Sequence, residues 1–354
     1  MKKVVVWALP LLLGAGLCAE DLDLSPRVGA VEIYGARKVP VRKIRAVLGV
    51  TDGSPLPPSK EGLEEKLDKI SGVVASRLEA SCCVDGRSIL YVGIEEKGSP
   101  HFEYRPSPDG DITLPKEITD LYSDFLSAVD KSVRAGQTGE SLNPGYSLMQ
   151  DSAARQDQLA FIPLVKTYLE TVHRVVRTSH DADQRSIAAY LLQYGPRSLK
   201  TNGEIVDDLQ YALRDGDDSV RANAIRSLTA MYVGSKLHPE QKLSIQPTWF
   251  VELLNSIVWS DRHNAAVALV DMTEGDSQDT LELIRERALP SVVEMARWHD
   301  LSKALPPFIL AGRLAGLSKK EIDDAWVNPE GRETVLKAAL KSKRHKSDTA
   351  NLFR

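Results

Sequence analysis

The spacing of apolar residues changes within the first hundred residues, and each change predicts a different element. Val31 and Ile33 alternate with more polar neighbours ahead of Gly35, which predicts a short, half-buried strand that ends in a turn. After Pro40 apolar residues recur every three or four positions, which predicts two amphipathic helices separated by a break at residues 53–58. Their apolar faces carry Val41, Ile44 and Leu48 in the first helix and Leu63, Leu67 and Ile70 in the second.

Alternation returns after Gly72 in two further segments, which are joined by a turn at Asp85 and Gly86. The first predicted strand has Val74, Ser76, Leu78 and Ala80 on one face, and the second has Leu90, Val92 and Ile94. The N-terminal part is therefore predicted to be a small α+β domain with the order strand, helix, helix, strand, strand.

That order, together with the residues at its joints, resembles a polypeptide-transport-associated (POTRA) domain over residues 27–98. The resemblance is carried by the segment 31–35, the helix at 44–48, Gly53 with Leu56, and the closing segment 90–96. It implies a periplasmic domain that binds partner chains by adding a strand to an exposed sheet edge. The candidate contacts on that edge are Val74, Ser76 and Leu78. The chain departs from the usual setting of the family in having one such unit.

The rest of the chain is predicted to be helical. Residues 99–116 are rich in Pro, Asp and Gly, which is typical of a linker. A helix with Ile118 and Phe125 on its apolar face is expected to follow, and from Gln150 onward the sequence predicts no strand. Residues 117–340 are therefore assigned to a helical domain.

Three segments of this domain share the pattern Arg-x-x-Ala-[Ala/Ile]-x-x-Leu. They begin at Arg185, Arg221 and Arg262, which are 36 and 41 residues apart. Positions i, i+3 and i+7 share one helix face, where the small Ala lets a neighbouring helix approach and Leu fills the layer. Acidic residues just ahead of the arginines are placed to cap the helix and to pair with an arginine of the same or the next unit. These acidic residues are Asp183, Asp217 with Asp218, and Asp261.

Two helices in roughly 40 residues, with Asp-x-x-Val-Arg at residues 217–221, resemble HEAT repeats over about residues 160–316. The first and third units lack the apolar residue before their arginines. The resemblance implies an all-α solenoid whose second helices line an extended concave surface for protein binding. Asn223, Arg226 and His263 are the candidate contacts on that surface, whereas the repeated arginines are interpreted as structural.

The first residues predict export. Lys2 and Lys3 precede an apolar run at residues 4–17, and the small Ala19 ends it, which is typical of a secretory signal peptide at residues 1–19. A run of 14 residues that contains a proline is shorter than the roughly 20 needed to span a bilayer. We expect cleavage after Ala19, and an uncleaved N-terminal anchor is the alternative.

The charge of the chain, taken together with export, argues against one class of partner. The chain has 45 basic and 49 acidic side chains, a net charge of -4, which becomes -6 when Lys2 and Lys3 leave with the signal. An acidic exported protein is not expected to bind nucleic acid. The prediction is a protein secreted across the inner membrane into the periplasm, with protein partners in the cell envelope and no membrane span in its mature form. Residues 341–354 are expected to be a solvated basic tail.

Two adjacent cysteines remain once Cys18 is removed with the signal. Cys82 and Cys83 lie at the end of the second predicted strand. In an oxidising compartment such a pair can form a strained ring, bond to another chain or bind a soft metal. Two neighbouring residues supply too few ligands for a metal site, and Cys82 continues the buried strand face, so a structural role is favoured over a functional thiol pair.

No local motif predicts catalysis. H-E-x-x-H, G-x-S-x-G, G-x-x-x-x-G-K-[ST], G-x-G-x-x-G and C-x-x-C do not occur. The acidic segment 215–218 lacks the other ligands of a calcium loop and stands where the repeat needs a turn and a cap. His173, His180 and His263 fall on separate predicted elements, so no metal, cofactor or catalytic residue is predicted. Packing between helices is the favoured role of Trp249, Trp259, Trp298 and Trp326.

Three hypotheses about function follow. The first is a non-enzymatic envelope scaffold that binds partner chains through the sheet edge and the helical surface. The second is an enzyme or small-ligand binder whose site is formed by residues from separate helices, which no local motif would reveal. A deep pocket with several convergent His, Asp or Glu side chains would favour the second hypothesis. The third is a structural component whose helical part dimerises.

Overall fold

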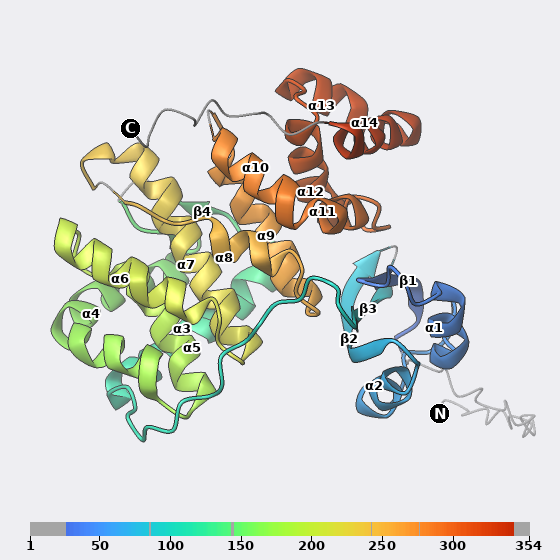
Figure 1. The fold of residues 1–354 in the computed structure, drawn as a ribbon. Helices are drawn as coiled ribbons and strands as arrows, with labels where there is room; N and C mark the ends of the chain where they lie inside the picture. Colours follow the sequence, from blue (N-terminus) through green and yellow to red (C-terminus); the bar gives the residue numbers. More distant parts are fainter. Residues whose placement is uncertain (1–25, 85, 143–144, 242, 276, 343–354) are drawn as a thin grey trace, which may run out of the picture.

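The computed structural model describes residues 26–84, 86–142, 145–241, 243–275 and 277–342, with the backbone alone for residues 82–84. The predicted signal peptide and all but two residues of the predicted basic tail lie outside these ranges. Figure 1 shows a small domain with a sheet beside a larger helical part.

The N-terminal domain has the predicted order of elements. They are β1 (Val28–Tyr34), α1 (Val41–Leu48), α2 (Glu61–Asp68), β2 (Val73–Val84) and β3 (Arg87–Glu96). The strand order in the sheet is β1-β3-β2, with β1 parallel to β3 and β2 antiparallel to β3. β1 and β2 are therefore the two edge strands.

The alternation read from the sequence separates the two faces of this sheet. Val31, Leu78, Leu90 and Val92 face α1 and α2, and they form a small core with Ile44 and other apolar residues of the helices. Side chains at the alternate positions face the helical part of the molecule instead, as Figure 1 shows for the sheet as a whole. The sheet is therefore covered on both faces, by its own helices and by the solenoid.

The segment predicted to be a linker runs along the helical part without forming a helix or a strand. Phe102 and Leu114 are buried in the large core. Arg105 N donates to Arg214 O at 2.6 Å, and Gly110 N donates to the carbonyl of residue 178 at 2.9 Å. Its Pro, Asp and Gly residues prevent regular structure, but these contacts fasten it along its length.

The helical part begins at α3 and contains two short strands. Its elements are α3 (Lys116–Arg134), β4 (Glu140–Ser141), β5 (Leu148–Met149), α4 (Ser152–Thr178), α5 (Ala182–Leu191), η1 (Leu192–Tyr194), α6 (Leu199–Ala212), α7 (Asp218–Leu237), η2 (Pro239–Gln241), α8 (Thr248–Leu253), α9 (Trp259–Met272), α10 (Gln278–Arg287), α11 (Leu289–Met295), α12 (Leu301–Leu314), α13 (Lys319–Trp326) and α14 (Pro329–Lys341). The strands β4 and β5 pair with each other in the segment between α3 and α4. In the described ranges no helix is both long and apolar enough to cross a membrane.

The three repeated segments are α5 with the first turn beyond it, α7 and α9. These helices stack in sequence order, and α12 packs beyond α9. Their partner helices are α4, α6 and α8. The repeated residues Ala188, Ala224, Ala265, Leu192, Leu228 and Leu269 are all fully buried between the helices. The fold is a helical repeat solenoid, and the small-residue and leucine positions have the predicted packing role.

Candidate functional site

The repeated arginines connect successive repeats through buried ion pairs. Arg185 donates from Nε and Nη2 to the two carboxylate oxygens of Asp215, each at 2.8 Å. Arg221 Nη2 lies 2.8 Å from Asp261 Oδ2. Burial raises the pKa of the Asp261 carboxyl, and the Arg221 guanidinium opposes this rise because it favours the charged carboxylate. Since Arg185 and Arg221 are each 1% exposed, the pairs supply the partners that water cannot.

Only some of the acidic residues ahead of the arginines have the predicted roles. Asp261 pairs with the arginine of the preceding repeat, and Asp217 caps α7 by accepting two backbone N–H groups. Asp183 instead lies in the first turn of α5, which Asp181 caps. Asp218 lies 3.8 Å from Arg77 of β2, so it contacts the N-terminal domain. Spacing along one helix did not show which carboxylate the next turn of the solenoid would bring to each arginine.

The third arginine joins the solenoid to the N-terminal domain. Arg262 Nη1 donates to Glu294 Oε2 at 3.1 Å, and Gly35 N donates to both oxygens of the same carboxylate at 3.0 Å. The Arg262 guanidinium also lies 4.5 Å from the centre of the Tyr34 ring. The Tyr34 hydroxyl donates to the Ile257 carbonyl at 2.7 Å. The series of ion pairs made by Arg185, Arg221 and Arg262 therefore ends at the contact between the solenoid and the N-terminal domain.

An aromatic cluster forms the centre of that contact. Tyr91 of β3 stacks on Trp259, with ring centroids 4.5 Å apart and an angle of 11° between the planes. The rings of Tyr91 and Trp298 meet edge to face, with their centroids 5.1 Å apart. Gly93 lies against the Ile257 carbonyl so closely that a Cβ atom there would be 2.1 Å from the oxygen. Trp259 and Trp298 are thus packing anchors, as predicted, but they anchor the sheet on the solenoid.

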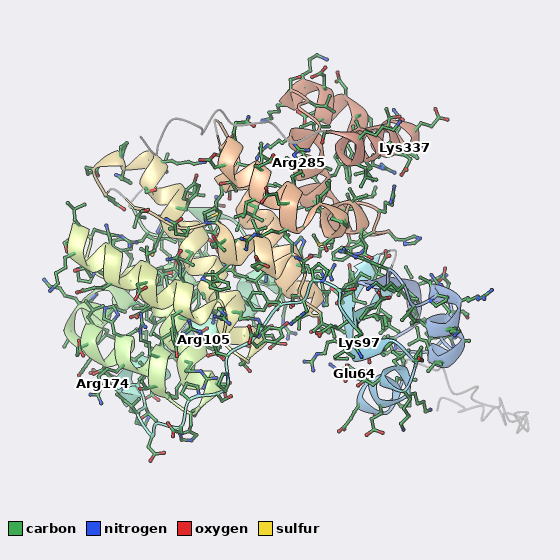
Figure 2. All side chains as sticks on the ribbon, viewed as in Figure 1. Glu64, Lys97, Arg105, Arg174, Arg285 and Lys337 are labelled. Carbon is green, nitrogen blue, oxygen red and sulfur yellow. The ribbon has the colours of Figure 1, made fainter. Side chains whose placement is uncertain are left out.

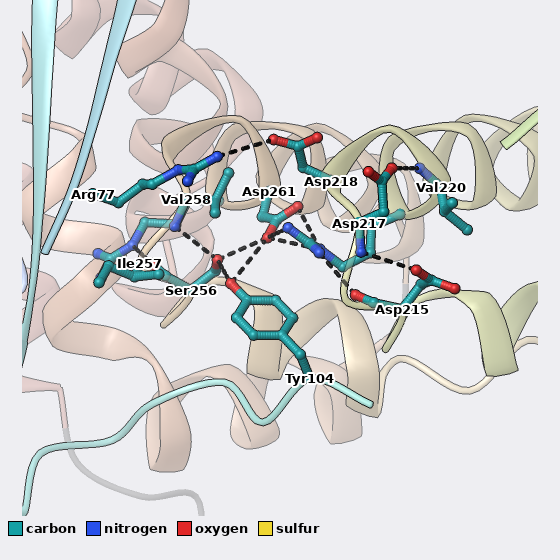
Figure 3. A network of polar contacts seen from close by, with 12 residues as sticks. Arg77, Tyr104, Asp215, Asp217, Asp218, Val220, Ser256, Ile257, Val258 and Asp261 are labelled. Atoms are coloured by element: carbon teal, nitrogen blue, oxygen red, sulfur yellow. Dashed lines mark hydrogen bonds and ion pairs between the residues drawn. The ribbon is translucent and has the colours of Figure 1, made fainter. Parts of the chain in front are cut away.

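A polar network at the same junction includes the segment between the two parts (Figure 3). The Tyr104 hydroxyl lies 2.7 Å from Ser256 Oγ, which donates to Asp261 Oδ2 at 2.8 Å. The Arg221 guanidinium lies 4.4 Å from the Tyr104 ring centroid. Burial raises the pKa of Tyr104 to about 12, so the hydroxyl keeps its proton at neutral pH. The network therefore links the repeat that contains Arg221 with the segment that contains Tyr104, next to the contact between the N-terminal domain and the solenoid.

The predicted solenoid contacts meet in one open cavity of about 670 Å³ over α7 and α9. Asn223 and Arg226 of α7 and His263 of α9 all line it. Its apolar lining includes Ile225, Val233 and Val267, of which Val267 is 39% exposed. The structure therefore brings together three residues that are up to 40 positions apart in the sequence.

The chain itself borders this cavity with the segment that contains β4. Glu140 forms an ion pair with Arg226 and accepts a hydrogen bond from Ser147 Oγ at 2.5 Å. The Tyr194 hydroxyl donates to the Ser147 carbonyl at 2.9 Å. Arg226, Tyr194 and local polar contacts thus hold the segment that contains β4 against the helices that line the cavity.

His263 is poorly suited to proton transfer at neutral pH. Burial and, secondly, the neighbouring Lys303 ammonium lower its pKa to about 4. Its Nδ1 atom is buried and has no hydrogen-bond partner among the residues that the structure describes. The ring is therefore a neutral, partly apolar wall of the cavity.

A second cavity, of about 520 Å³, meets the first at Asp271 and lies among α9, α10, α12 and α13. Asp271, Glu274 and Asp323 place carboxylates along it, and Arg313 and Lys319 supply two cations. Burial raises the pKa of the Asp271 carboxyl. The two cavities share Asp271 in their linings and are here called together the α7–α12 groove.

The predicted contacts on β2 differ in accessibility. Val74 is 55% exposed, whereas the Leu78 side chain is fully buried and cannot contact a partner. The Leu78 N–H, which points to the outer edge, donates to Glu64 Oε1 of α2 at 2.6 Å. Ser76 Oγ donates to Asp68 Oδ1 at 2.7 Å. The middle of this edge is therefore occupied by α2, and its start at Val74 is open (Figure 2 marks Glu64).

The remaining chemical candidates lie apart from one another. His173 contacts Asp208, and His180 Nδ1 lies 3.0 Å from the Gly110 carbonyl oxygen, so neither approaches His263 in the cavity. The backbone of Cys82 and Cys83 belongs to β2, and their thiols lie outside the described side chains.

Comparisons with known proteins add little beyond this geometry. No family model matches the chain, and no curated protein matches it either. Among solved structures, a designed armadillo repeat protein is similar to 55% of this chain and 94% of its own length, at 12% identity and a TM-score of 0.34.

Sequence reasoning missed Glu140 and Ser147 as groove residues and Tyr91 as the centre of the junction. Glu140 stands in a Gly-rich loop whose position depends on distant packing. Tyr91 did carry a signal: it is a large aromatic residue on the strand face opposite to the small core, and that face had no assigned cover.

Proposed function

We propose that the protein is an exported, non-enzymatic scaffold of the cell envelope, made of a POTRA-like domain fixed to a HEAT-like solenoid. In this proposal the α7–α12 groove holds an extended segment of a partner protein. The observation that carries the proposal is that Asn223, Arg226 and His263, which come from two successive repeats, line one open cavity that shares Asp271 with a second cavity. Two neighbouring open cavities along a row of helices match an extended chain better than a compact small molecule.

Equivalent positions of two repeats support backbone recognition. Asn223 and Asn264 each stand two residues after a repeated arginine, and both line the larger cavity. A side-chain amide can donate to a peptide carbonyl and accept from a peptide N–H at the same time. Asn223 Nδ2 donates to the Ser186 carbonyl at 3.1 Å and to Ser186 Oγ at 2.9 Å, whereas the side-chain amide of Asn264 makes no hydrogen bond within the described ranges. Asn264 is therefore the freer of the two amides.

The groove also defines the chemistry of the segment that it would hold. Apolar side chains of the partner would cover the half-buried Val233 and the exposed Val267, whose contact with water is unfavourable. A basic side chain would lie near the carboxylates of Asp271 and Glu274 at the far end. The non-enzymatic part of the proposal rests on the sequence, which contains none of the local catalytic motifs named above.

Site-specific crosslinking tests the groove. A photo-crosslinking residue replaces Val267 in the groove or, as a matched control, the exposed Leu199 of α6, and the chain is irradiated in its own cells. We expect a defined crosslinked protein from position 267 and none from position 199. The captured protein should lose binding to Val267→Glu and keep binding to Leu199→Glu. Equal crosslinking at both positions, or binding unaffected by Val267→Glu, would refute the proposal.

The POTRA-like sheet edge is the second proposed contact. A partner strand that adds to β2 would begin to pair at the exposed Val74. Further along the same edge, the outward N–H group of Leu78 already donates to the Glu64 carboxylate. A partner strand must therefore displace the Glu64 carboxylate to extend along β2. This arrangement protects the edge from unspecific pairing while a suitable strand is absent.

Export is proposed from the N-terminal pattern alone. We expect the chain isolated from its cells to begin at Glu20 and to be released with the periplasmic fraction. Edman degradation of that chain is the measurement. A first residue of Met1, or recovery with the cytoplasmic fraction, would contradict this part of the proposal and would leave the groove untouched.

A further inference from the structure

The N-terminal domain has a basic surface that the scaffold proposal does not use. Residues 33–51 contain five cationic side chains and no acidic one, in a protein whose net charge is negative. The cations are Arg37, Lys38, Arg42, Lys43 and Arg45, all of them exposed. Such a segregation of one sign of charge creates a local positive potential.

The fold directs these charges outward from α1. Ile44 and Leu48 face the small core, and Arg42, Lys43 and Arg45 are distributed over the remaining, exposed surface of the helix. None of these three side chains forms an ion pair within the described ranges. They are consequently free to meet an external anion.

The flanking turn extends the basic surface, and its backbone binds the carboxylate of Glu96. Lys38 Nζ donates to the Lys97 carbonyl at 3.4 Å, which places the exposed Lys97 next to the turn that precedes α1. Glu96 is 2% exposed and accepts the backbone N–H groups of Arg37, Lys38 and Val39 at 2.7–2.9 Å. Those bonds lower the pKa of Glu96 against the effect of burial, and its charge is directed inward. We call the surface formed by Lys38, Arg42, Lys43, Arg45 and Lys97 the α1 basic face.

We propose that the α1 basic face binds the surface of a bilayer containing anionic phospholipids. α1 lines neither cavity of the α7–α12 groove and neither of the pockets at Gly35 and at Tyr104, so these cavities offer no walls for an acidic peptide bound at α1. An extended array of phosphate groups instead matches several exposed cations gathered on one helix and its flanking turn. Val41, 40% exposed at the start of the helix, lies among the cations and can enter the headgroup layer.

The orientation that follows leaves the solenoid accessible. α1 and α2 lie on the side of the sheet that faces away from the helical part (Figure 1). Binding through α1 would therefore hold the α7–α12 groove away from the bilayer. The neighbouring α2 carries both signs of charge, including the exposed Glu61 and Glu65, which limits the attraction to the α1 side of the domain.

Vesicle flotation with the full chain tests the proposal. The vesicles contain phosphatidylcholine with 0 or 30% phosphatidylglycerol, at low and at high salt. The test variant is Arg42→Gln/Lys43→Gln/Arg45→Gln, and the control Lys116→Gln/Lys200→Gln/Lys320→Gln removes the same charge from exposed solenoid positions. Each lysine or arginine near an anionic bilayer contributes enough that losing three weakens binding by about 100-fold.

We expect the wild type and the control to float with anionic vesicles at low salt and the α1 variant to be lost from them. Salt should weaken binding of the wild type, because screened charges attract phosphates less. Equal binding to neutral and anionic vesicles would overturn the proposal. So would equal losses in the two triple variants. An α1 variant that still floats normally but no longer binds an acidic protein partner would overturn it in favour of a protein ligand.

Discussion

Removing the guanidinium of Arg221 should lower the free energy of unfolding, because the carboxylate of its partner Asp261 stays buried. Arg221→Met keeps most of the side-chain volume, but it deletes the 2.8 Å contact with Asp261 and the 2.8 Å hydrogen bond to the Asp215 carbonyl. Asp261 is 1% exposed, so its carboxylate would remain in the interior without a counter-charge. Breaking a buried pair in this way costs about 3–5 kcal/mol of unfolding free energy. We expect a loss near the middle of that range.

The dependence on pH gives this prediction its sign. Burial already raises the pKa of Asp261, and removal of Arg221 raises it further. An acid whose pKa is higher in the folded protein than in the unfolded chain binds more protons in the folded protein, so its presence favours folding increasingly as the pH falls. The destabilisation by Arg221→Met should therefore be largest at neutral pH and should shrink towards acidic pH.

Urea denaturation followed by circular dichroism measures the effect at neutral and at acidic pH. The double variant Arg221→Met/Asp261→Asn should recover much of the lost stability, because no unpaired charge remains. The surface control Lys116→Met, which breaks an exposed pair with Asp120, should stay within about 0.5 kcal/mol of the wild type. A loss below about 1 kcal/mol in Arg221→Met, or no recovery in the double variant, would refute the claim that the buried Asp261 carboxylate depends on Arg221 as its counter-charge.

Three further predictions concern the junction, the sheet edge and the cavity. Gly93→Ala should separate the N-terminal domain from the solenoid, because its Cβ would collide with the Ile257 carbonyl; faster limited proteolysis between the two parts is the expected result, and an unchanged pattern would contradict it. Glu64→Ala frees the Leu78 N–H, so we expect tighter strand addition or new self-association by light scattering, and an unaltered monomer with unaltered partner affinity would argue against an edge guard. His263→Leu should flatten the dependence of unfolding free energy on pH between pH 4 and 6.5. In the wild type the lowered pKa means that His263 binds a proton mainly in the unfolded chain over this range, so stability rises with pH. Equal slopes in wild type and variant would exclude this role.

The sequence alone determined the elements and their order. The period of two in residues 73–96 and the period of three to four in the repeats each describe a local geometry that side-chain spacing specifies directly. The buried Ala224 and Leu228 occupy the positions that their spacing from Arg221 predicted. The three contact candidates of the solenoid were also predicted together, because equivalent positions of stacked repeats must share one surface.

Only the tertiary structure decided which distant groups meet. The partner of Arg185 is Asp215 and that of Arg262 is Glu294, and each depends on the displacement between successive helix pairs, which no single helix encodes. The stacking of Tyr91 on Trp259 depends on the whole sheet being placed against the solenoid. Periodicity shows which face of an element is apolar, whereas the identity of the covering surface follows from packing among all elements at once.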